Sequence, residues 1–137
     1  MSIDQLIEDF SFLEEWEDRY RYVIELGQNL EALSDEERVG ANKVHGCASQ
    51  VWLVCQSDPA VPNAPLHFRG DSDAHIVRGL IAILFSIYND KTPAEITAID
   101  EKPLLVRLGL EEHLSPQRSN GLHSMIKRIR ETAESRL

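Results

Sequence analysis

The strongest pattern in the sequence is an apolar stripe of helical spacing between residues 76 and 88. Its members are Ile76, Val77, Leu80, Ile81, Leu84, Phe85 and Tyr88. Ala82, Ile83 and Ile87 add apolar side chains outside this stripe, which predicts a helix that is covered on most sides. We therefore expect this helix to form the centre of the hydrophobic core.

Further helices are predicted on both sides of this segment. Ser2 and Gln5 match a capping box, Thr92–Glu95 matches another with proline at the first helical position, and Ser115 precedes a similar proline. Asp71–Asp73 supply N-cap chemistry for the central helix. The other predicted helices cover about 3–13, about 16–31, a segment that begins at Pro93, a short helix over 103–108 that Gly109 stops, and a last helix that begins at Pro116 and includes 122–133.

Three short strands are predicted between the second helix and the central one. They lie at Val44, at Ser49–Gln56 and at Leu66–Arg69, and the connection over 58–65 holds three prolines and is excluded as a central strand. The expected fold class is α+β, with a small antiparallel sheet of about three strands packed against N- and C-terminal helices. At 137 residues, the chain is expected to be a single domain over 1–137.

The charge of the chain is concentrated at its start. Residues 1–39 hold 12 acidic and three basic side chains, while the whole chain has 23 acidic and 14 basic ones and a net charge of −9. Such a balance argues against nucleic-acid binding by phosphate neutralisation. The acidic helices are expected to form a solvated face, and the alternative is a docking surface for a basic partner.

No apolar stretch reaches the roughly 20 residues of a membrane span. The longest, Gly79–Asn89, is bounded by Arg78 and Asp90. The N-terminus carries acidic residues where a secretory signal would carry basic ones. We therefore expect a cytoplasmic protein with reduced thiols and no membrane contact.

Cys47 is the best candidate for chemistry. It lies between two predicted strands, and Gly46 and Ala48 leave its thiol without bulky neighbours. A thiolate is the reactive form of cysteine, and His45 would favour it if the imidazole came near the sulfur. The alternative is a buried cysteine that packs as a small hydrophobe.

The remaining candidates for chemistry are weaker. Cys55 shares a strand face with Val51 and Leu53 and is expected to be a core or edge residue without a role. The histidines and cysteines lack the paired spacing of a structural zinc site, so we expect no metal. Phosphate-binding loops, dinucleotide fingerprints and serine-hydrolase elbows are also absent from the sequence.

Four motifs in order resemble the SufE family of sulfur-acceptor proteins in iron-sulfur cluster assembly. They are WEDRYRYVIELG, HGCASQVW, GDSDAHIVRGL and LSPQRSNGL, and together they span nearly the whole chain. The resemblance implies a SufE/NifU-like fold and a partnership with a SufS-type cysteine desulfurase. Pyridoxal phosphate belongs to that desulfurase, so no cofactor is expected here.

The resemblance also implies roles for individual residues. Cys47 would take the persulfide sulfur of the desulfurase, stimulate that enzyme and pass the sulfur to a SufBCD-type scaffold. Its loop would shelter the thiol until a partner docks. Asp73 and Arg118 resemble polar residues near this loop. Together with His45 and Ser49 they are expected to bind the partner or support the loop, although His45 is not assigned as a base. Asp73 also suits a helix N-terminus, and Arg118 a surface ion pair.

Three alternatives stay open at this point. The desulfurase partner could be of the related Csd type. The chain could be a self-contained thiol enzyme that pairs Cys47 with His113 or His123. It could also be a non-catalytic adaptor that docks through its acidic helices.

Overall fold

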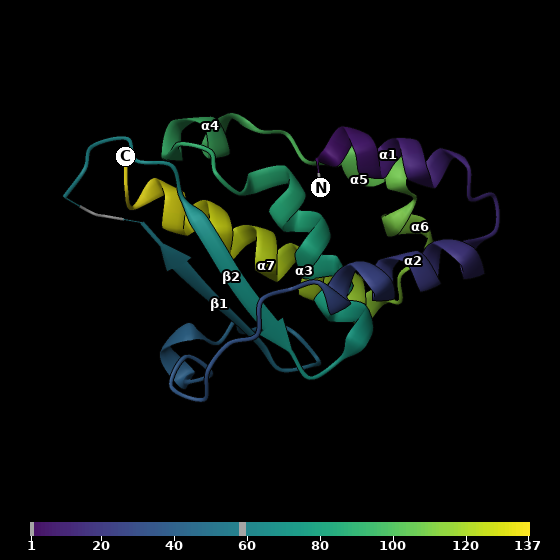
Figure 1. Cartoon of the computed structure of the whole chain (residues 1–137), viewed down its shortest axis with the longest axis horizontal. Coiled ribbons are helices and arrows are strands. Elements are labelled where there is room, and N and C mark those ends of the chain that lie inside the picture. The colour runs from purple at the N-terminus through teal and green to yellow at the C-terminus, as the bar shows by residue number, and fades with distance from the viewer. Residues whose placement is uncertain (1, 58–59) are drawn as a thin grey trace.

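The computed structural model describes residues 2–57 and 60–137 (Figure 1). In chain order the elements are α1 (Ile3–Ser11), α2 (Trp16–Gln28), the 3-10 helix η1 (Gly40–Asn42), β1 (Val51–Gln56), β2 (His67–Ser72), α3 (His75–Tyr88), α4 (Pro93–Ala98), α5 (Lys102–Leu108), α6 (Leu110–His113) and α7 (Pro116–Glu134). Figure 1 shows the strand pair along one side of the molecule and α1, α2, α5 and α6 gathered at the opposite end. The α+β class is confirmed.

Helix α3 is the centre of the core, as its apolar pattern predicts. It contacts α1, α2, α7 and β2. Its buried apolar side chains face more than one neighbouring element. They are Ile76, Val77, Leu80, Ile81, Ile83, Leu84, Ile87 and Tyr88. Burial of each large side chain of this kind stabilises a fold by about 1.5–3 kcal/mol, so α3 supplies much of the hydrophobic driving force.

Helices α2 and α3 cross with their backbones in contact. A Cβ atom on Gly27 would lie 2.6 Å from the backbone nitrogen of Gly79, and one on Gly79 would overlap the carbonyl oxygen of Val23. Only glycine allows so close an approach. The crossing fixes α2 firmly on the central helix.

The sheet has two strands where the sequence predicts about three. β1 and β2 pair antiparallel, with Val51 opposite Ser72 and Gln56 opposite His67. The segment at Val44 forms only an isolated bridge, in which its N–H donates to the carbonyl of Val51 at 2.8 Å and Lys43 pairs with Trp52. No ladder forms there because η1 ends at residue 42 and the chain turns away at residue 46.

The strand boundaries also differ from the prediction. β1 begins at Val51 and leaves Ser49 in the preceding loop, while β2 starts one residue after Leu66 and continues to Ser72. The proline-rich connection is irregular over 60–65, and Asp58 and Pro59 lie outside the described residues.

Asp71–Asp73 do not cap α3, so this prediction is wrong. The N-cap residue is Ala74, which has no capping side chain, and Asp71 lies in β2. The Asp71 carboxylate is buried between the guanidinium groups of Arg38 and Arg78, at 3.4 and 3.3 Å. Tertiary ion pairing has therefore replaced the local role that the sequence indicates.

The other helix signals are largely confirmed. Thr92 and Glu95 form a complete capping box before α4, Ser115 caps α7, and Gly109 ends α5 in the left-handed region. Ser2 accepts a hydrogen bond from the N–H of Gln5. The first two helices end earlier than predicted, at residues 11 and 28, and the short helix α6 was not predicted.

Candidate functional site

Cys47 lies in a loop, as predicted, but this loop runs from the 3-10 helix η1 to β1 and not between two strands. We call residues 43–50 the Cys47 loop. The thiol is free and half-buried, and Sγ lies 3.6 Å from the carbonyl oxygen of Gly121 on α7, where the S–H donates a weak hydrogen bond. Burial raises the pKa of the Cys47 thiol. In this position the thiol is therefore protonated and sheltered rather than primed to react.

One face of α7 receives the tip of this loop. Gly121 has no side chain there, and a Cβ atom at this position would lie 3.5 Å from the Cys47 Sγ. One turn further along α7, the side chain of Ser124 lies where a Cβ atom of residue 46 would be, and Gly46 has a φ of 90° in the left-handed region. The two helix residues are three apart and share one face, so the loop tip lies along the helix.

The start of the Cys47 loop is held by Arg128, one turn beyond Ser124. Nη2 of Arg128 donates to the carbonyl of Ala41 at 3.0 Å, and Nη1 donates to the carbonyl of Lys43 at 3.3 Å. Sequence reasoning missed this contact. The signal that could have indicated it is the spacing of Gly121, Ser124 and Arg128 on one helical face.

The end of the Cys47 loop is held by Asp73. Its Oδ1 accepts a hydrogen bond from the N–H of Gln50 at 3.0 Å, and its own N–H donates to the carbonyl of Gln50 at 3.3 Å. The side chain is otherwise exposed. This placement suits the predicted loop-supporting role of Asp73, and that role remains a prediction.

The other predicted site residues lie in the Cys47 loop or at the start of α7, and none of them is hydrogen-bonded to the sulfur within the described residues. His45 is exposed and lines a groove of about 240 Å³ between the loop and α7. Ser49 is half-buried two residues beyond Cys47. Arg118 is exposed at the start of α7, with Cζ 5.9 Å from the centre of the Tyr20 ring. Arg118 thus links α7 to α2, and it has no acidic partner among residues 2–57 and 60–137.

No histidine is placed to act as a base for Cys47 in the described part of the chain. His113 stacks on Trp16, with ring centres 4.5 Å apart. His123 pairs with Glu111 at 3.8 Å. Burial alone accounts for the pKa shift of Cys47, without an imidazole contribution.

The described residues contain no group of three or more histidine, cysteine or acidic side chains that is arranged to hold a metal ion. Over residues 2–57 and 60–137, no helix combines the length and apolar character needed to cross a bilayer.

Cys55 is half-buried on β1 and packs against the core, as predicted.

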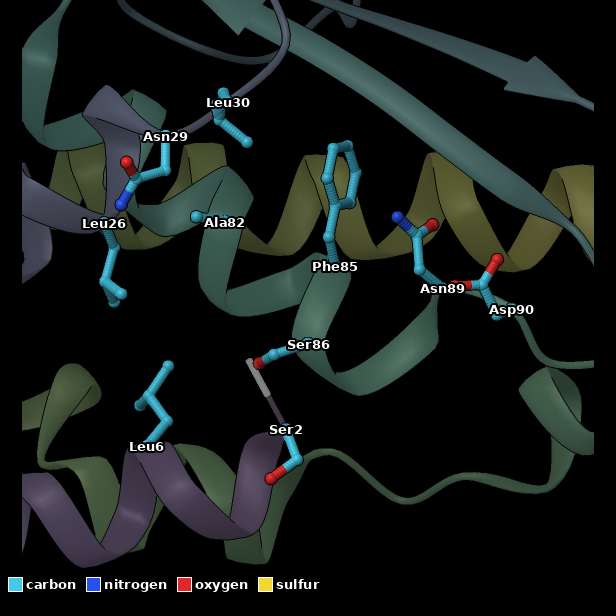
Figure 2. A pocket seen from close by; sticks show the side chains of 10 residues that line it. All are labelled: Ser2, Leu6, Leu26, Asn29, Leu30, Ala82, Phe85, Ser86, Asn89 and Asp90. Carbon is cyan, nitrogen blue, oxygen red and sulfur yellow. The ribbon is translucent and has the colours of Figure 1, made fainter.

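A separate hollow of about 490 Å³ lies between α1, the end of α2 and α3 (Figure 2). Leu6, Leu26 and Phe85 give it apolar walls. Both polar ends of the Asn89 amide at its rim are already bonded to the backbone of Phe68. No residue of the Cys47 loop lines this hollow, so it adds nothing to the chemistry of Cys47.

Comparison with known proteins identifies the family. The family model described as SufE, Fe-S metabolism associated domain, matches residues 4–133. The chain belongs to the SufE family. This SufE-family assignment confirms the resemblance carried by the four motifs and supports a role in iron-sulfur metabolism.

Two curated relatives of this SufE-family protein come from rhizobia. An uncharacterized SufE-like protein of Rhizobium meliloti is 57% identical over 136 residues, which cover 99% of this chain and 97% of the relative. One from Rhizobium etli is 57% identical over 135 residues, covering 98% and 91%. The solution structure of a hypothetical protein from Thermus thermophilus matches with a TM-score of 0.75 over 99% of this chain and 98% of its own, at 18% identity, and so shows the shared fold.

Proposed function

We propose that Cys47 accepts persulfide sulfur from a SufS-type cysteine desulfurase and passes it to a SufBCD-type scaffold for iron-sulfur cluster assembly. The observation that carries the proposal is the position of Cys47, half-buried on α7 in a loop that is held at both ends. The protein is not an enzyme on its own in this proposal. It stimulates the desulfurase by taking its product sulfur, and the pyridoxal phosphate stays with that partner.

The transfer step is a thiol–persulfide exchange. The Cys47 thiolate attacks the terminal sulfur of the donor persulfide, a new S–S bond forms on Cys47, and the S–S bond of the donor breaks. The donor cysteine leaves as a thiolate and takes up the proton that Cys47 gave up. No external oxidant or reductant is needed, because the sulfane sulfur moves without net redox change.

The shelter on α7 suits a carrier of persulfide. A persulfide is readily oxidised or captured by other thiols, and a half-buried sulfur is less accessible to both. The raised pKa of Cys47 further limits reaction before a donor arrives. Low reactivity of the free thiol suits the cytoplasm, where other reduced thiols are abundant. We propose that the protein acts there.

The same geometry disfavours the self-contained thiol enzyme. Such an enzyme needs a base within hydrogen-bond reach of its nucleophile. His113 and His123 are engaged with Trp16 and Glu111 instead. The Csd-type desulfurase remains the alternative partner of the same chemistry.

The test is mass spectrometry after incubation with a SufS-type desulfurase, pyridoxal phosphate and cysteine. Cys55→Ser is the matched control for Cys47→Ser, since both thiols are half-buried and free and burial raises the pKa of each. We expect an added mass of about 32 Da on the Cys47 peptide in the wild type and in Cys55→Ser, and none in Cys47→Ser. Absence of added sulfur on Cys47 with an active desulfurase would overturn the proposal. Full stimulation of the desulfurase by Cys47→Ser would favour the adaptor that docks through α1 and α2.

A further inference from the structure

Arg128 has an unusual set of partners for a charged side chain. It is half-buried on α7, and within the described residues no acidic group lies within ion-pair distance of it. Its guanidinium instead donates to the carbonyls of Ala41 and Lys43. Hydrogen bonds from an ionised donor are stronger than neutral ones, so this pair is a substantial restraint.

The restraint acts at one defined point of the chain. Ala41 belongs to η1, and Lys43 is the first residue of the Cys47 loop. The next residue, Val44, is buried and hydrogen-bonded to Val51. Arg128 therefore ties η1 and the first loop residue to the same helix face on which Cys47 lies.

The contacts beyond Val44 are much weaker. Cys47 packs against the edge of the core and makes one weak S–H hydrogen bond to Gly121, and Ser124 occupies the place where a Cβ atom of Gly46 would be. The chain is held firmly again only at Gln50, by Asp73. Residues 45–49 are thus a short span of weak contacts between two strong attachment points.

We propose that Arg128 is a positioning residue that holds the first attachment point and so confines movement of Cys47 to residues 45–49. This inference rests on the proposed function for its purpose and on the contacts of Arg128 for its mechanism. Three residues beyond a fixed Val44, Cys47 can reach at most about 11 Å from it. A short tether returns the thiol to its shelter and limits the volume that it searches for a donor.

The test is the alkylation rate of Cys47 by iodoacetamide in the isolated protein, read by peptide mapping. Cys55 is an internal reference in every sample, because it is a half-buried thiol on β1 away from the loop. Global opening accelerates both cysteines, whereas release of the loop accelerates Cys47 alone. The ratio of the two rates therefore separates the two effects.

In Arg128→Met we expect this ratio to rise about tenfold, as loss of two charge-assisted hydrogen bonds implies. Arg128→Lys keeps the charge but does not span both carbonyls, so its ratio should lie between those of the wild type and Arg128→Met. Lys127→Met is the matched control, since Lys127 is the adjacent residue and is 77% exposed. Its ratio should equal that of the wild type.

Two outcomes would overturn the inference. One is a wild-type ratio in Arg128→Met. The other is an equal acceleration of both cysteines, which would make Arg128 a general stabiliser of the fold. Because this assay contains no desulfurase, its result is independent of whether Cys47 accepts sulfur.

Discussion

The thiol of Cys47 rests on the backbone of Gly121, with Sγ 3.6 Å from the carbonyl oxygen. A methyl group at Gly121 would make ordinary contact with the sulfur, at 3.5 Å. A longer side chain would occupy the place of the thiol. The size of the residue at 121 thus decides whether the shelter exists.

Gly121→Ala should keep the alkylation rate of Cys47 within about twofold of the wild type. It should also raise the free energy of unfolding by about 0.5–1 kcal/mol, because alanine stabilises a helix relative to glycine. Gly121→Leu should displace the thiol and accelerate its alkylation about tenfold. Denaturant unfolding and iodoacetamide kinetics measure the two effects. Slow alkylation in a folded Gly121→Leu protein would show that the loop finds shelter elsewhere.

The alkylation of Cys47 should also depend on pH in a defined direction. Burial favours the neutral thiol and raises its pKa, so the rate should rise with a midpoint above the ordinary cysteine value of about 8.5. The same shift means that ionisation of Cys47 lowers the stability of the sheltered position as the pH rises through this pKa. In urea-unfolded protein the midpoint should return to the ordinary value. A folded-state midpoint below about 8.5 would indicate a nearby cation that stabilises the thiolate.

Asp73 offers a test of the second attachment point. Asp73→Ala removes the acceptor for the Gln50 N–H and should raise the alkylation rate of Cys47 about fivefold relative to Cys55. Asp73→Asn keeps an oxygen acceptor and should stay within about twofold of the wild type. If the asparagine variant matched the alanine one, the charge of Asp73 rather than its hydrogen bond would hold the loop.

Local sequence signals predicted the parts of this fold whose cause is local. The apolar stripe of α3, the capping box at Thr92 and the glycine stop at residue 109 each depend on neighbours a few positions away. Cys47 was found for the same reason, since small neighbours and a turn are visible in the sequence. Periodicity could not supply the SufE family, which came from four ordered motifs.

The errors lie where distant residues decide the outcome. The Val44 segment has strand character, but the turn at Gly46 leaves no length for a ladder. Arg128 reads as one more surface charge on α7, because its carbonyl partners lie more than 80 positions earlier in the chain. Such contacts have no local signature, so the residues that hold the Cys47 loop emerge only from the structure.

Asp71 shows this difference between local and distant causes most clearly. In the sequence it has the chemistry of a helix N-cap, and in the structure it belongs to a buried ion pair. Its carboxylate faces Arg38 and Arg78 and also accepts the N–H of Ser72 at 2.8 Å. Asp71→Ala should therefore lower the free energy of unfolding by about 2–3 kcal/mol, because two guanidinium groups lose a buried partner. A surface N-cap would cost only about 1 kcal/mol.

The matched control is Asp35→Ala. Asp35 pairs with the same Arg38 at 2.5 Å, but its side chain is 96% exposed. An exposed pair contributes little, so this variant should leave the denaturation midpoint nearly unchanged. The measurement is urea unfolding of both variants, and the midpoints can be compared directly when the m-values are unchanged. Equal losses in the two variants would show that Arg38, and not the buried position of Asp71, determines the stability of this network.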